Sequence, residues 1–307
     1  MKVNKAKPTV TIGIPAFNEE ANILNLLNSL LKQNQKNYLL KEIIVASDNS
    51  TDKTIHCAKQ ANDKRIILID NKKRVGKNKR VNQIIKKCKG EILVLIDADT
   101  IPKNHTTIES LIQPFLHDSK TVYTSGVPEP VKPNTFMGNA IQVGRNVWNK
   151  LRDEINDGKG IYTCHGQLYA LKSGFAKRNP YPKEMWTDST FYYFTCLKQR
   201  LVYQPAKKAI VLFSAPSTVK DHISQIGRYQ NLNNISIKYF GEDIRKEFDI
   251  PPVLLYKYKL EAFLRYPIHS LVIFALNLYA KYSTRILKKI NSGVWETQSS
   301  TKKIIKL

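Results

Sequence analysis

Two aspartates one residue apart, Asp97 and Asp99, end an unbroken apolar run that begins at Ile92. In an extended chain, side chains two positions apart share a face, so both carboxylates can reach one cation or one sugar phosphate. Such an apolar run suits a parallel strand covered on both faces, and the carboxyl ends of these strands are where open α/β sheets bind ligands. A structural explanation is equally open, because Asp followed by Thr100 and Pro102 can form a turn or cap the next helix.

Two earlier strand ends are also polar. The segment 15–19 reads Pro-Ala-Phe-Asn-Glu, and the segment 46–52 reads Ala-Ser-Asp-Asn-Ser-Thr-Asp. Each one alone is explained by a turn or a helix cap. Three polar strand ends on one edge of a sheet, however, predict a crevice for a charged ligand.

The elements that must position these residues alternate between strand and helix patterns, which predicts a parallel sheet wrapped by helices. Strands are expected over 9–14, 42–46, 65–69, 92–97, 122–127 and 166–171, and helices over 19–31, from 52, and over 77–88, 138–151 and 188–198. The expected fold class is α/β, with a single nucleotide-binding sheet that is mixed but mostly parallel and flanked by helices. We expect residues 1–241 to form this domain and residues 242–307 to form a helical C-terminal region with a loose tail after Gly293.

The charge balance indicates an anionic partner. Lys and Arg number 49 against 25 Asp and Glu, a net charge of +24 among 307 residues. Nucleic acid, anionic lipid and phosphate-bearing substrates all fit this excess. The four cysteines form no C-x-x-C pair and no apolar stretch precedes Pro8, so a zinc site, a disulfide framework and a secretory signal are not expected, and a cytoplasmic location is.

The most apolar stretch, residues 267–280, has basic residues on both sides. As a helix it would span roughly 20 Å, against a hydrocarbon core of about 30 Å, and is therefore too short to cross a membrane. Two interpretations remain open, a helix lying in the anionic inner surface of the cell membrane and a helix of the protein core.

Taken in order, several segments resemble the family 2 glycosyltransferases of the GT-A fold. The matching segments are 14–20, 45–52, Gly76-Lys77 through Asn82, Asp97-Ala98-Asp99, Gly166, Thr187-Asp188, and Gln-Ile-Gly-Arg-Tyr at 225–229. The resemblance spans residues 9–232. It implies an inverting, metal-dependent transferase that uses a nucleotide-diphosphate sugar as donor.

The resemblance also implies roles for single residues on the donor side. Asp97 and Asp99 would bind Mn²⁺ or Mg²⁺, with Asp99 on the cation and Asp97 shared with the sugar side of the donor. The remaining donor residues would be Pro15, Phe17 and Glu19 in the nucleoside pocket, Asp48 on the base, and Lys77 and Arg228 on the diphosphate.

On the acceptor side, Asp188 matches the catalytic base, which takes the proton from the attacking hydroxyl. Thr187 departs from the usual Glu before this Asp, and a helix-capping role for Asp188 is compatible with the catalytic one. The other acceptor-side residues would be Gly166, His165, Gln225 and Tyr229, where Tyr229 replaces the Trp of the Gln-x-x-Arg-Trp motif of polysaccharide synthases.

Competing functions explain less of the chain. A processive polysaccharide synthase would need a membrane conduit, yet no segment reaches about 18 apolar residues. A nucleic-acid-binding protein would explain the charge but not the carboxylates, so no nucleic-acid partner is expected. We therefore expect transfer of one sugar to a hydroxyl of a lipid or lipid-linked glycan at the membrane, by a peripheral protein of undetermined oligomeric state.

Overall fold

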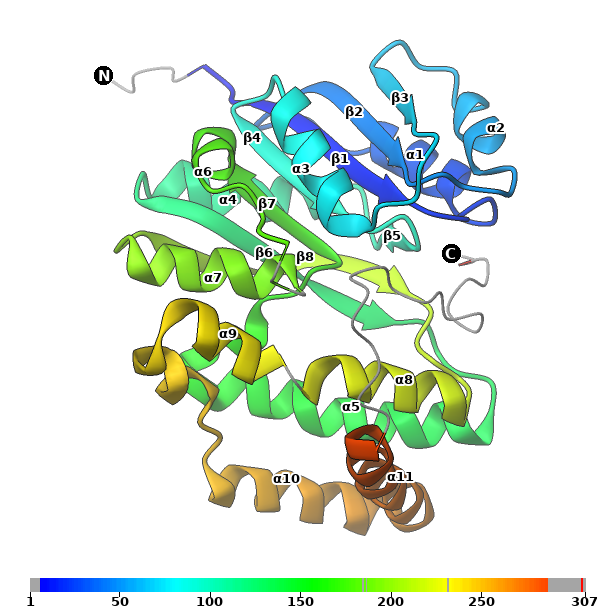
Figure 1. Ribbon diagram of the computed structural model, residues 1–307, viewed down its shortest axis with the longest axis vertical. Helices are drawn as coiled ribbons and strands as arrows, with labels where there is room; N and C mark the ends of the chain where they lie inside the picture. Colours follow the sequence, from blue (N-terminus) through cyan, green and yellow to red (C-terminus); the bar gives the residue numbers. More distant parts are fainter. Residues whose placement is uncertain (1–5, 184, 186, 231, 287–304, 306–307) are drawn as a thin grey trace.

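The computed structural model describes residues 6–183, 185, 187–230, 232–286 and 305. Within them the chain forms an eight-stranded sheet in the order β3-β2-β1-β4-β7-β6-β8-β5, with helices on both faces (Figure 1). The strands are β1 (Thr9–Ala16), β2 (Leu39–Ser47), β3 (Ile66–Asp70), β4 (Ile92–Ile96), β5 (Thr100–Pro102), β6 (Thr121–Pro130), β7 (Leu168–Lys172) and β8 (Val202–Phe213). The expected α/β class and mixed sheet are confirmed.

The helices alternate with these strands in the first half and dominate the end of the chain. They are α1 (Ile23–Leu31), α2 (Thr54–Lys59), α3 (Lys77–Lys87), α4 (Thr107–His117), α5 (Phe136–Glu154), α6 (Ser173–Arg178), α7 (Asp188–Lys198), α8 (Val219–Gln230), α9 (Leu232–Phe240), α10 (Pro252–Arg265) and α11 (Pro267–Ile286). Short 3-10 turns cover Ile155–Gly158, Ile161–Thr163 and Glu242–Phe248.

The first half of the sheet is parallel because each strand returns through a helix. β1 pairs in parallel with β2 and β4, and β2 pairs in parallel with β3. β4 is buried at every position, as its unbroken apolar sequence predicts. Helices α1, α2 and α4 pack on one face of the sheet, and α3, α6 and α7 on the other.

The second half changes direction at β7, which runs antiparallel to both β4 and β6. β7 therefore begins where β4 ends, and the Asp97 N–H donates to the Gln167 carbonyl over 3.0 Å. Several details differ from the sequence-based expectation, which did not include β5, α4 or α6. Gly166 precedes β7 instead of lying in it, and β8, a 12-residue strand broken in pattern by Pro205, was not anticipated.

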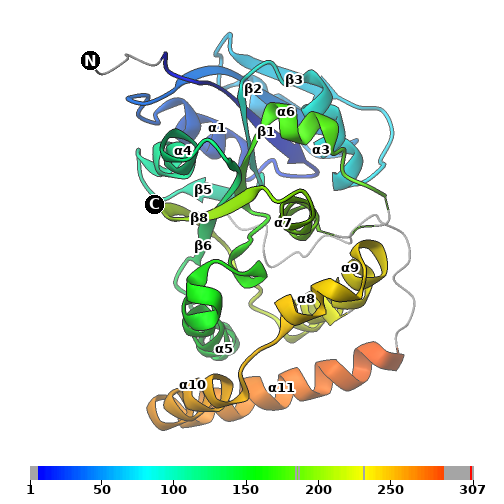
Figure 2. The same ribbon diagram turned by 90° about the vertical axis from the view of Figure 1, so that its left-hand side faces the viewer.

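The C-terminal helices pack away from the sheet. α10 and α11 contact α5, and α11 also contacts α8, so that α5 and α8 lie between them and the sheet (Figure 2). Among the described residues no helix is both long and apolar enough to cross a membrane. The expected loose tail after Gly293 lies outside the described residues, and the boundary at residue 241 stays a prediction.

Candidate active site

Three ionisable side chains from three elements meet at the carboxyl end of β4. Asp97 follows β4 directly, Lys77 is the first residue of α3, and Asp188 is the first residue of α7. The Lys77 ammonium lies 2.6 Å from Asp97 Oδ1 and 3.6 Å from Asp188 Oδ2. One cation thus bridges two carboxylates that are 91 positions apart in the sequence.

The carboxylate of Asp188 is fixed in place. Its Oδ2 accepts a hydrogen bond from the Tyr169 hydroxyl and its Oδ1 accepts one from the Ser189 N–H, both over 2.9 Å. A Cβ built on Gly166 would lie 2.9 Å from Asp188 Oδ1, so only glycine leaves room for the carboxylate there. Asp188 is only 5% exposed and points into the space beside Lys77.

The segment that leads into Asp188 is held by the same helix that supplies Lys77. The Asn82 side chain donates to the Tyr181 carbonyl over 2.7 Å and accepts from the Tyr181 N–H over 2.8 Å. The Asn78 amide donates to the Met185 carbonyl over 3.0 Å. Because α3 anchors this loop and carries Lys77, the spacing between the ammonium and Asp188 is set by one rigid element.

Burial and charge act on both partners of the central ion pair. Burial raises the pKa of Asp97 to about 6, although the Lys77 charge opposes this rise. Burial alone would lower the pKa of Lys77, but the charges of Asp188 and Asp97 outweigh it and raise that pKa. Lys77 therefore stays positively charged and can stabilise negative charge that develops nearby.

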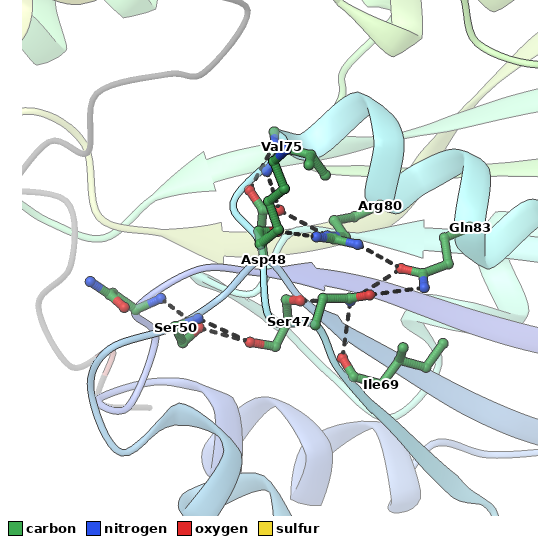
Figure 3. A network of polar contacts seen from close by, with 11 residues as sticks. Ser47, Asp48, Ser50, Ile69, Val75, Arg80 and Gln83 are labelled. Atoms are coloured by element: carbon green, nitrogen blue, oxygen red, sulfur yellow. Dashed lines mark hydrogen bonds and ion pairs between the residues drawn. The ribbon is translucent and has the colours of Figure 1, made fainter.

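Asp48, the residue directly after β2, forms a second polar network (Figure 3). Its Oδ1 accepts from the Val75 N–H at 2.9 Å and from Arg80 Nε at 2.8 Å, and its Oδ2 accepts from the Gly76 N–H at 2.8 Å. The ion pair with Arg80 is buried. Asp48 thereby fixes the backbone just before Lys77; its expected contact with a nucleotide base stays a prediction.

The first strand end lies beside that network, since Ala16 pairs with Ser47 and its carbonyl accepts from the Asp48 N–H at 2.8 Å. Pro15 and Phe17 are partly exposed, and the Arg74 guanidinium stacks 3.9 Å from the centre of the Phe17 ring. Glu19 is buried, and its N–H donates to Thr54 Oγ1 over 2.7 Å. The structure thus brings Pro15, Phe17 and Glu19 to the same sheet edge as Asp97.

The expected acceptor-side residues are only partly united. Gly166 lies next to Asp188, whereas its chain neighbour His165 contacts Arg152 and Ser125. Gln225 lies on α8, and within the described residues no hydrogen bond or ion pair connects it to Lys77 or the active-site carboxylates. Arg228 and Tyr229 are residues of α8, and their side chains lie outside the described part of the structure.

The donor set suits a hard cation that arrives with its substrate. Asp97 and Asp99 are partly exposed, and they lie in a turn closed by a hydrogen bond from the Thr100 N–H to the Asp97 carbonyl, not in an extended strand. The Asp99 charge contributes to the raised pKa of Asp97, so the two carboxylates lie close together. Among the described residues no group of three or more potential ligands gathers. Two carboxylates completed by diphosphate oxygens are nevertheless a normal Mg²⁺ or Mn²⁺ site, and the residues present fit that arrangement.

Several residues of the site escaped the sequence reasoning. Tyr169, Ser189 and Arg80 act as hydrogen-bond donors to Asp188 or Asp48, and Arg74 stacks on Phe17. Arg74 and Arg80 lie in a basic run that equally suits a solvated helix face. The one available signal was their proximity in sequence to Gly76 and Lys77.

The sheet order, the polar strand ends and the central carboxylates together define the GT-A fold of sugar-nucleotide-dependent glycosyltransferases. A solved mannosyltransferase from Pyrobaculum calidifontis, in complex with GDP-Man and Mn²⁺, superimposes with a TM-score of 0.60 over 92% of this chain and 76% of its own, at 17% identity. Glucosyl-3-phosphoglycerate synthase from Mycobacterium tuberculosis, solved with Mn²⁺, UDP and phosphoglyceric acid, gives a TM-score of 0.54 over 77% of this chain and 80% of its own, also at 17% identity. Residues 11–177, more than half of the chain, match the model of glycosyl transferase family 2, and the chain belongs to this family.

Curated relatives match over shorter stretches. Poly-beta-1,6-N-acetyl-D-glucosamine synthase of Staphylococcus aureus is 30% identical over 132 residues, which are 42% of this chain and 31% of the synthase. The Escherichia coli UDP-Glc:alpha-D-GlcNAc-diphosphoundecaprenol beta-1,3-glucosyltransferase WfgD is 28% identical over 142 residues, which are 46% of this chain and 54% of that enzyme. The matched part thus spans between about a third and a half of these relatives.

Proposed function

We propose that this chain is an inverting glycosyltransferase that moves one sugar from a nucleotide-diphosphate sugar to a hydroxyl of a lipid or lipid-linked glycan. The observation that carries the proposal is the Lys77 ammonium held between Asp97 and the fixed carboxylate of Asp188. It places a base and a leaving-group cation within one small space, and family membership supports the same reaction class.

In this proposal Asp188 accepts the proton of the acceptor hydroxyl while that oxygen bonds to the anomeric carbon. The bond from the anomeric carbon to the diphosphate breaks at the same time, and its electron pair leaves with the phosphate oxygen. The Tyr169 and Ser189 donors keep the carboxylate aimed during the attack. The proposed inversion requires the hydroxyl activated by Asp188 to attack the anomeric carbon from the face opposite the departing diphosphate.

The chain's own contribution to the leaving group is the charge of Lys77, which stays protonated beside Asp97. Asp99 and Asp97 would bind Mn²⁺ or Mg²⁺ together with the diphosphate, and that cation would neutralise the departing charge. The named neighbours bind Mn²⁺ with nucleotides, which supports this kind of cofactor.

The experiment measures nucleotide release from a panel of nucleotide sugars in the presence of Mn²⁺ or Mg²⁺. Asp188→Ala is expected to lose turnover by about 100-fold or more yet keep nucleotide binding, because only proton transfer is removed. Asp99→Ala is expected to lose turnover and metal-dependent nucleotide binding together. Asp243→Asn, an exposed aspartate paired with Lys198, is the matched control and should match wild type. Equal release by all four proteins would remove the proposed mechanism, and a polymeric product would favour the processive alternative.

The membrane part of the proposal rests on the outer surface of α10 and α11. Exposed apolar side chains gather there, and they are Val253, Tyr256, Leu260, Phe263, Leu264, Tyr266, Ile268, Leu271, Leu278, Tyr279 and Tyr282. Lys257, Arg265 and Lys281 are exposed between them. Apolar and basic groups on one surface fit the interface of an anionic bilayer, at the inner face of the cell membrane.

Liposome flotation tests this surface. Wild-type protein should float with vesicles that contain anionic phosphatidylglycerol, and Leu260→Glu combined with Leu264→Glu should float about tenfold less, since two large apolar anchors are lost. Leu116→Glu, on the exposed side of α4, is the matched control and should float like wild type. Recovery in the unbound fraction with every lipid would refute the membrane claim, and a dimer in light scattering that the double variant abolishes would assign the surface to a second copy.

A further inference from the structure

Helix α5 carries two arginines on the face that points toward the sheet. Arg145 and Arg152 are seven positions apart, which places their Cα atoms on one side of the helix with a rise of about 10 Å between them. Another side of α5 is apolar and packs on α10 through Val147 and Leu151. Arg145 contacts Phe213 of β8 and Arg152 contacts His165, so both arginines lie on the side of α5 that faces the sheet.

Arg152 contacts the ring of His165. Its Nη1 lies 3.1 Å from His165 Nε2, and the backbone N–H of His165 donates to Ser125 Oγ over 2.8 Å. Burial lowers the pKa of His165 well below its usual value, and the charges of Arg152 and Arg145 lower it further. The ring is therefore neutral, accepts from Arg152 at Nε2 and carries its proton on Nδ1.

Arg145 lies nearer the N-terminal end of α5 and contacts the end of β8. Its guanidinium stacks 4.7 Å from the centre of the Phe213 ring, at the end of β8. Phe213 pairs with Thr100, the residue that follows Asp99. The two arginines thus flank the region between the Asp97 and Asp99 carboxylates and the His165-Gly166 segment.

His165 connects this basic cluster to the base. The next residue, Gly166, lies so close to the base that a Cβ added to it would be 2.9 Å from Asp188 Oδ1. All three side chains, Arg145, Arg152 and His165, are partly exposed. A molecule whose hydroxyl reaches Asp188 therefore has two guanidinium groups and an imidazole N–H within reach of its neighbouring groups.

We propose that Arg145, Arg152 and His165 form a subsite for a phosphate or diphosphate group of the acceptor. Guanidinium groups bind phosphate oxygens through paired charge-assisted hydrogen bonds, and two arginines on one helix face, two turns apart, can together hold a diphosphate. This inference rests on the proposed transferase function and narrows its acceptor to a phosphorylated one. The donor diphosphate belongs on the other side, at Lys77.

The test measures binding of farnesyl diphosphate, with farnesol as the uncharged comparison, by titration calorimetry in the presence of Mg²⁺. Wild type is expected to bind the diphosphate at least tenfold more tightly than farnesol. Arg145→Gln combined with Arg152→Gln should abolish that difference, because the charge-assisted hydrogen bonds to the phosphates are lost. Lys150→Gln, a basic residue of the same helix that pairs with Glu261, is the matched control and should behave like wild type.

Further arms separate the possible sources of the signal. Lys77→Met should keep farnesyl diphosphate binding, and its loss there would place the ligand in the donor site and overturn the subsite. The double arginine variant should still float with anionic vesicles. If it stops floating with them but still binds farnesyl diphosphate, the arginines bind lipid headgroups instead. Arg152→Lys should bind with intermediate affinity, which separates a lost charge from a misfolded protein. Because no turnover is measured, a failed nucleotide-release assay and a failed binding assay refute different claims.

Discussion

Replacing Gly166 by alanine tests whether the position of Asp188 limits the reaction. The new Cβ would lie 2.9 Å from Asp188 Oδ1, whereas an ordinary van der Waals contact begins near 3.4 Å. The carboxylate must therefore move by about 0.5 Å, which stretches its 2.9 Å hydrogen bonds from Tyr169 and Ser189 toward the edge of the hydrogen-bonding range.

The energetic consequence follows from the charge of Asp188. Loss of one hydrogen bond to a charged group costs about 1.5 to 3 kcal/mol. If this free energy is lost from the transition state, in which the Asp188 carboxylate takes the proton, kcat should drop about 10- to 100-fold. The KM for the nucleotide sugar should change by less than about twofold, because Gly166 contacts the base and not the Lys77 side of the site.

The assay is steady-state nucleotide release with saturating metal, compared with thermal unfolding of the same samples. Gly174→Ala is the matched control, since its new Cβ would meet only the end of the flexible Arg178 side chain, at 3.4 Å. The control should keep wild-type kcat. A Gly166→Ala enzyme with wild-type kcat would refute the reasoning that the fixed position of Asp188 controls the rate.

Three further predictions concern the basic and titratable residues. Arg80→Ala should lower the free energy of unfolding in urea by about 3 to 5 kcal/mol, because it leaves the Asp48 carboxylate buried without its cation. Lys79→Ala, at an exposed position, should change that free energy by less than about 0.5 kcal/mol. Equal losses would contradict the buried pair. Lys77→Ala should weaken nucleoside diphosphate binding in calorimetry about tenfold or more relative to Lys79→Ala, and unchanged affinity would remove Lys77 from the donor site. The pKa of His165 is lowered on folding, so the unfolded chain binds this proton more readily than the folded one. The free energy of unfolding should therefore fall as the pH drops below about 6.5, by up to about 1.4 kcal/mol per pH unit. His165→Gln should flatten that slope, and identical slopes would show that His165 does not titrate this way.

Much of the donor half could be predicted because its signals are local. The apolar run before Asp97 determines a buried strand, and a parallel strand's carboxyl end determines where the two carboxylates emerge. The fold class and the family were therefore predictable, and both are confirmed. The roles of the individual site residues stay predictions for the experiments above.

The network around Asp48 shows what local signals miss. Its sequence predicts a turn or a helix cap, yet both carboxylate oxygens bind the chain 27 to 32 positions later. Nothing in the composition of the basic run distinguishes buried Arg80 from exposed Lys79. Only the packing of α3 against β1 and β2 turns one of the two inward, because neighbouring positions on a helix face different directions.

The sequence by itself determined the chemistry available to this protein: carboxylates at strand ends, a lysine at the start of a helix, and an excess of positive charge. Only the tertiary structure decided which groups meet. β7 turns back antiparallel to β4, and that reversal brings Gly166 and Tyr169 beside Asp188 and within reach of Lys77. Distances of about 3 Å between residues some 90 positions apart depend on strand order and helix packing, which are properties of the whole chain and not of any one motif.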